Sequence, residues 1–185
     1  MKLLVGLGNP GRSYEGTRHN VGFAVLEILA RRAGSPARRT RFQGEVVQAT
    51  LRGCPVLLLW PLTWMNLSGS SVLAARDFYK IGDADMLVIC DDFQLPLDTI
   101  RLRPAGSSGG QNGLSDVLKR LGTTAIPRLR LGVGPLPAGW KSADFVLGKF
   151  SKGEADAAEV MLERAADAAE EWTALGIQAA MNRYN

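Results

Sequence analysis

The stretch VGLGNPGRSYEGTRHN, residues 5–20, follows an apolar run and carries the pattern G-x-G-x-x-G between Gly6 and Gly11. In a dinucleotide-binding fold this pattern opens a helix, whose N-terminus then faces the pyrophosphate. Here the first segment with helical spacing begins only near Asn20, and the acidic residue at the expected distance, Glu27, lies inside that segment. The pattern therefore indicates a turn that presents Asn9 at the end of the first strand.

Strand-like and helix-like segments alternate along the rest of the chain. The patterns predict strands at 2–6, 42–51, 54–60, 86–90, 100–103 and 128–134, and helices at 20–33, 68–79, 112–121 and 152–175. The segment 104–110 is rich in Gly and Ser, which is typical of a mobile loop. We therefore expect an α/β fold, a single domain over residues 1–185 with a twisted, mixed and mostly parallel sheet and helices on both faces.

Composition limits the class of protein. The chain has 185 residues and is 46% hydrophobic, which suffices for one well-packed core. It has no apolar run of about eighteen residues and no signal-peptide pattern, so we expect a cytoplasmic protein. Cys54 and Cys90 lie in apolar runs without metal-ligand spacing, which predicts buried free thiols and no metal site.

Charge is unevenly distributed. Residues 1–60 hold nine Lys and Arg against three Asp and Glu, whereas residues 151–185 hold three against seven. The first surplus favours a positive face that suits RNA, and the second is typical of an acidic, solvated helix face. Charge alone does not separate this interpretation from a simple bias in composition.

Polar side chains gather where the predicted strands end. Asn9, Asn66, Asp91 and Asn112 all follow strands or precede helices, and such positions converge on the crevice at the carboxyl ends of an α/β sheet. His19, the only histidine, lies in the first of these loops. A histidine beside a carboxylate can take a proton from water, while amides hold a carbonyl group. The alternative interpretation is that these side chains have structural roles. His19 would then cap a helix, Asn66 and Asn112 would be N-caps, and Asp91 would pair with an arginine.

Longer motifs connect these positions. The stretches LLVGLGNPGRSYEGTRHNVGF, LTWMNLSG, LVICDDFQLPLDTIRLRPAGSSGGQNGL and RLRLGVG occur in this order, and the chain closes on MNRYN. Together they resemble the bacterial-type peptidyl-tRNA hydrolase family over nearly the whole chain. The resemblance implies an esterase that cleaves the bond between a peptide and the 3′ ribose of tRNA. It also implies a monomeric, cytoplasmic enzyme without a cofactor or metal.

The resemblance implies a role for each matching residue. His19 matches the catalytic histidine, and Asp91 matches the aspartate that orients it. The peptide moiety is expected to contact Asn9, Tyr14, Met65, Asn66 and Asn112, the last of which also positions water. The tRNA acceptor end is expected to contact Arg101, Arg103 and Arg130, with Lys119 and Arg120 as weaker additions.

The chain departs from the family pattern at three positions. Cys90 and Gln111 stand where histidine is usual, and Trp64 stands where tyrosine or phenylalanine is common. Two other classes also stay open from the residues. One is a non-enzymatic RNA-binding protein on the same scaffold, and the other is a nucleotide-dependent oxidoreductase that uses the glycine pattern.

Overall fold

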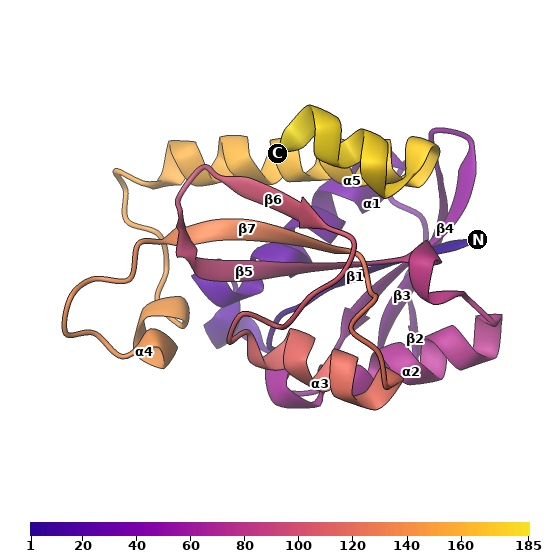
Figure 1. Cartoon of the computed structure of the whole chain (residues 1–185), viewed down its shortest axis with the longest axis horizontal. Coiled ribbons are helices and arrows are strands. Elements are labelled where there is room, and N and C mark those ends of the chain that lie inside the picture. Colours follow the sequence, from indigo (N-terminus) through magenta and orange to yellow (C-terminus); the bar gives the residue numbers. More distant parts are fainter.

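Seven strands form one mixed sheet in the order β2-β3-β4-β1-β5-β7-β6 in a computed structural model that describes all residues 1–185 (Figure 1). The strands are β1 (Lys2–Gly6), β2 (Arg39–Arg41), β3 (Gly44–Leu51), β4 (Cys54–Pro61), β5 (Met86–Pro96), β6 (Ile100–Arg103) and β7 (Arg128–Gly134). The helices are α1 (Val21–Arg32), α2 (Ser68–Tyr79), α3 (Asn112–Leu121), α4 (Ser142–Val146) and α5 (Ala155–Tyr184).

The centre of the sheet is parallel and its edges are antiparallel. Strand β1 lies between β4 and β5 and runs parallel to both, and β5 pairs in parallel with β7. The β2-β3-β4 meander and the β6-β7 pair are antiparallel. The predicted mixed sheet is therefore confirmed, with its parallel pairing confined to the four central strands.

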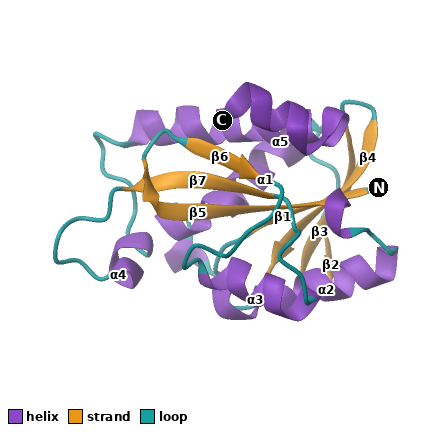
Figure 2. Ribbon diagram, in the orientation of Figure 1, coloured by secondary structure: helices purple, strands orange, loops and turns teal.

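Helices cover both faces of this sheet, as predicted (Figure 2). Along β1, Leu4 belongs to a core cluster that also contains residues of α1 and α5, whereas Leu3 and Val5 belong to a cluster shared with α2 and α3. Successive side chains of a strand point to opposite faces, so a strand buried on both sides is a continuous apolar run. This burial explains why the central strands are readily recognised in the sequence.

The strand that carries Asp91 is longer than predicted. We expected the apolar run to close at Asp91, but β5 continues to Pro96. It does so because Asp91 and Asp92 still pair with Leu131 and Gly132 of β7, with an irregularity before Pro96. Asp91 is therefore held in place by its pairing with β7.

Other expectations also need correction. Strand β2 and helix α4 were not predicted. Cys54 was expected to be buried but is half-buried, because it lies at the hairpin end of β4. The backbone of α5 leaves helical geometry at Gly176, where φ is 84°, and then continues to Tyr184. The predicted helix end at residue 175 therefore marks only the break before Gly176, and α5 is longer than predicted.

The acidic face of α5 is not simply solvated. Glu163, Asp167 and Glu170 form ion pairs with Arg31 or Arg32 of α1, or with the hairpin arginine at position 52. These pairs neutralise part of the positive surplus of residues 1–60. No helix combines the length and the apolar character needed to cross a membrane.

Candidate active site

A cavity of about 350 Å³ lies where the loops after β1 and β4 meet β5, β7, α4 and the segment before α3. Seven of the expected catalytic, peptide-binding and tRNA-binding residues line it, namely Asn9, His19, Met65, Asn66, Asp91, Asn112 and Arg130. Tyr14, Arg101 and Arg103 do not line it. Tyr14 packs edge-on against Trp64, whose ring belongs to the cavity wall, at 6.0 Å between ring centroids.

His19 and Asp91 meet at one side of the cavity. The His19 Nδ1 atom lies 2.9 Å from Oδ2 of Asp91, and the two side chains are 12% and 2% exposed. An ionised carboxylate only accepts hydrogen bonds, so the proton of a neutral imidazole sits on Nδ1 in this arrangement. The Nε2 atom is thereby left as a free acceptor.

Two glycines allow His19 to come this close to the sheet. His19 belongs to a short 3-10 turn, Arg18–Asn20, that leads directly into α1. A methyl group at Gly22 would overlap the carbonyl oxygen of Ile89, and one at Gly6 would overlap the carbonyl oxygen of Gly22. The start of α1 therefore rests on the backbone of β1 and β5, which brings the turn beside Asp91.

Carboxamides hold the loops around the cavity in place. The Asn20 side chain accepts from the backbone N–H of Asn9 and donates to its carbonyl oxygen, both at 2.9 Å. The Asn9 Oδ1 atom accepts from the backbone N–H of Met65 at 2.8 Å. The Asn9 amide nitrogen has no protein acceptor, so it can donate to a molecule in the cavity.

Asn66 and Asn112 are not helix caps. Both are exposed side chains at the cavity, and α2 begins at Ser68 without any side-chain cap. The N-cap of α3 is Gln111, whose Oε1 atom accepts from the backbone N–H of Leu114 at 2.7 Å. The capping alternative considered for the two asparagines is therefore wrong.

Arg18 anchors the turn that carries His19. Its guanidinium lies between the rings of Phe145 and Phe150, at 4.5 and 4.7 Å from their centroids. It donates to the carbonyl oxygen of Val133 at 3.2 Å and to Glu154 at 2.8 Å. This contact lowers the pKa of Glu154 to about 2. The turn is thus tied to α4 and to the start of α5.

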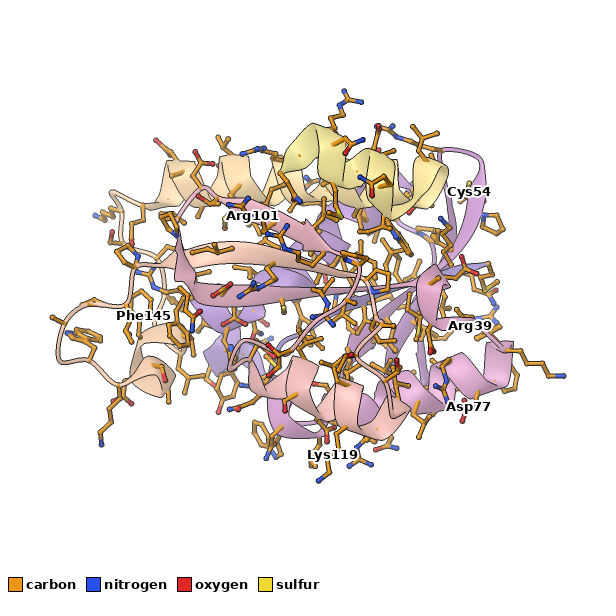
Figure 3. The ribbon with its side chains drawn as sticks, viewed as in Figure 1. Arg39, Cys54, Asp77, Arg101, Lys119 and Phe145 are labelled. Atoms are coloured by element: carbon orange, nitrogen blue, oxygen red, sulfur yellow. The ribbon has the colours of Figure 1, made fainter.

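The predicted tRNA contacts lie in different environments. Arg130 lines the cavity and forms an ion pair with Asp92, whereas Arg101 and Arg103 lie on β6 without acidic partners. Figure 3 shows Arg101 on β6, near the middle of the view, and Lys119 on α3, at its lower edge. The predicted tRNA contacts therefore come from different elements of the fold.

Arg128 shapes the Gly-rich segment 104–110. Its side chain is 2% exposed, and it donates to the carbonyl oxygens of Gly106 and Ser107, both at 2.9 Å. Burial lowers the pKa of this guanidinium. The segment has no regular secondary structure, but Arg128 ties its middle to the protein.

The remaining polar groups complete the chemistry of the site. No group of three or more His, Cys, Asp and Glu side chains is placed to hold a metal ion. Burial raises the pKa of the Cys90 thiol, so this thiol stays protonated and is a poor nucleophile.

Sequence reasoning did not assign roles to Arg18, Asn20 and Gln111. Each is buried and holds a neighbouring loop or side chain in place. Gln111 is the N-cap of α3, a position for which asparagine was considered from the sequence. The contacts of Arg18 and Asn20 depend on residues distant in the chain.

The fold and the cavity define the chain as an α/β protein with a polar cavity at the carboxyl ends of its parallel strands. The profile of the family described as peptidyl-tRNA hydrolase matches residues 3–185. Relatives named peptidyl-tRNA hydrolase from Rhodopirellula baltica and Chloroflexus aggregans are 50% and 47% identical to it over 186 residues. These alignments cover 100% of this chain and 97% and 99% of the two relatives.

A solved structure agrees with these relatives. The crystal structure of peptidyl-tRNA hydrolase from Acinetobacter baumannii matches the chain with a TM-score of 0.93 and 34% identity. The match covers 100% of this chain and 94% of that one. The chain belongs to the peptidyl-tRNA hydrolase family.

Proposed function

We propose that residues 1–185 act as one domain that hydrolyses the ester between a peptide and the 3′ ribose of tRNA, with His19 as general base. The observation that carries this proposal is the His19–Asp91 contact of 2.9 Å inside a cavity lined by carboxamides. Family membership supplies the substrate class.

The chemistry needs only water and this pair. Asp91 keeps the imidazole proton on Nδ1, and Nε2 takes a proton from the water that adds to the ester carbonyl. The tetrahedral intermediate then collapses, the bond to the ribose oxygen breaks, and the imidazolium returns its proton to that oxygen. Asn112, which is exposed at the cavity, holds the attacking water in this proposal.

The developing oxyanion requires a donor. The free amide of Asn9 is such a donor, and its orientation is fixed because its oxygen is already bound by the backbone of Met65. One well-placed donor to an oxyanion contributes about 2.7 to 4 kcal/mol to transition-state stabilisation. Removing this amide should therefore lower kcat more than it raises KM.

Recognition divides between the two parts of the substrate. Asn66 and Asn112 pair with peptide amides beside Met65 and Tyr14, and a carboxamide can bind an amide without attracting a free ammonium group. This favours peptidyl-tRNA over aminoacyl-tRNA.

The tRNA part is bound through its phosphates. The basic residues Arg101, Arg103 and Arg130 hold the acceptor end, and the first two have no acidic partner that competes for them. The enzyme acts as a monomer in the cytoplasm and uses no cofactor or metal.

The test uses an N-blocked aminoacyl-tRNA and the free aminoacyl-tRNA, each with and without a chelator, and follows release of the acyl group. We expect release from the blocked substrate alone, unaffected by the chelator. His19→Ala should lower kcat by about 10² to 10⁴ while the circular dichroism spectrum is unchanged. Binding of the substrate without release would instead favour a non-enzymatic RNA-binding protein.

A further inference from the structure

Gln111 connects helix α3 to the catalytic pair. The side chain is buried, and its Oε1 atom accepts from the backbone N–H of Leu114 at 2.7 Å. A backbone N–H only donates, so the other end of the amide must be the nitrogen. That nitrogen lies 3.0 Å from Oδ1 of Asp91 and 3.3 Å from the sulfur of Met65. The helix cap thus determines which end of Gln111 faces Asp91.

Each carboxylate oxygen of Asp91 therefore receives one donor. Oδ2 receives the His19 ring N–H, and Oδ1 receives the Gln111 amide. A buried carboxylate without such partners is costly, and it is free to rotate away from the group it should orient. We propose that Gln111 is a positioning residue that fixes the rotation of Asp91, and with it the tautomer of His19. This inference rests on the proposed function.

Gln111 performs this task without a charge of its own. The charged and titratable groups around Asp91 are His19, Cys90 and the ion pair between Asp92 and Arg130. A neutral amide holds the carboxylate equally over the whole working pH range.

Two substitutions separate positioning from capping. Gln111→Ser keeps a side-chain oxygen suited to the N-cap of α3, but it is too short to reach Asp91. Gln111→Glu keeps the shape and the cap and places a carboxylate against Asp91. Gln178→Glu, at an exposed position on α5, is the matched control.

Activity is measured as kcat and KM on an N-blocked aminoacyl-tRNA. For Gln111→Ser we expect kcat to fall about 10- to 100-fold, the range for residues that orient a reacting group, with KM within about twofold. A residue that only caps α3 would leave kcat unchanged in this variant. A kcat within about twofold of the unmodified enzyme would overturn the proposal.

A second readout needs no substrate. His19 is the only histidine, so its ring protons can be followed by NMR without ambiguity. The NMR shifts of its ring nitrogens report which nitrogen carries the proton. In Gln111→Glu two carboxylates face each other across the 3.0 Å contact and share one proton, which keeps a donor against Oδ1 of Asp91, so the His19 proton should stay on Nδ1. Gln111→Ser lacks this donor and should show a mixture of the two tautomers. A single Nδ1–H tautomer in Gln111→Ser would overturn the proposal. This readout also decides the role of Gln111 if the unmodified chain releases no acyl group, an outcome that would contradict the proposed function alone.

Discussion

Replacing Asp91 by asparagine should switch the tautomer of His19. The Gln111 amide nitrogen faces Oδ1 of Asp91 at 3.0 Å, so the new amide at position 91 must turn its oxygen toward Gln111. Its NH₂ group then faces Nδ1 of His19 across the 2.9 Å contact. Nδ1 becomes an acceptor, the imidazole proton moves to Nε2, and no base faces the water.

Two losses determine the size of the effect. Restoring the productive tautomer requires two donors to face each other across a buried contact, and a buried unsatisfied donor costs about 1 to 3 kcal/mol. The imidazolium that forms during the reaction also loses its attraction to the carboxylate, about 4 Å from its charge. This attraction is worth about 4 kcal/mol at an effective dielectric constant of 20, and less here because His19 is slightly exposed. Together these losses predict a fall in kcat of about 10³ to 10⁴.

The assay is release of the acyl group from an N-blocked aminoacyl-tRNA at saturating substrate. Asp156→Asn, an exposed aspartate in the first turn of α5, makes the same chemical change away from the cavity and should leave kcat unchanged. Equal unfolding midpoints in urea for Asp91→Asn and the unmodified chain would show that the loss of kcat is not a loss of fold.

A double variant tests the reasoning directly. In Asp91→Asn combined with Gln111→Glu, the new carboxylate at position 111 accepts from the new amide, which turns the amide oxygen back toward His19. The productive tautomer is then restored, and kcat should rise at least about tenfold above that of Asp91→Asn alone. A double variant no more active than Asp91→Asn would refute the proposed orientation.

Three further predictions concern the surroundings of the site. Because Arg18 lowers the pKa of Glu154 to about 2, below its ordinary value of 4.5, this pair stabilises the fold above about pH 4.5 and stops doing so as pH falls toward 2. Glu154→Gln should therefore lower the free energy of unfolding in urea by about 1 kcal/mol at pH 7, after allowance for solvent screening, and by almost nothing near pH 2. Arg103→Ala should raise KM for the tRNA substrate and reduce the slope of log KM against log salt by about 0.7 to 0.9, with kcat unchanged in steady-state kinetics. Gly22→Ala should destabilise the fold by about 1 to 3 kcal/mol in urea and lower kcat by displacing the start of α1, whereas Gly153→Ala, which meets no neighbour, should do neither.

Much of the fold is predictable because local patterns report burial. Helix α3 and strand β7 have the predicted boundaries, since each combines clear periodicity with a Gly- or Pro-containing stop. Strand β2 has three exposed residues and α4 has only five residues, so neither shows a periodic pattern. The apolar run of β4 likewise did not reveal that Cys54 lies at the half-exposed end of a hairpin.

The residue types of the candidate site and the pairing of His19 with Asp91 were predicted, the pairing through the family resemblance, but the contacts of the neighbouring side chains were not. A single histidine and polar residues at strand ends already indicate where the chemistry lies. The sequence does not indicate that Gln111, and not Asn112, caps α3. It also does not show that Arg130 is paired with Asp92 while Arg103 is not. Both outcomes depend on side-chain directions that spacing alone leaves undetermined.

The amino-acid order by itself determined which segments are strands and helices, and which side chains can carry acid–base chemistry, because both follow from local periodicity and residue type. Only the tertiary structure decided that His19 meets Asp91, 72 positions along the chain, and that Gln111 holds the opposite oxygen. The physical reason is that hydrogen bonds act over about 3 Å, and the close packing of α1 and α3 on the sheet brings such distant residues within that range.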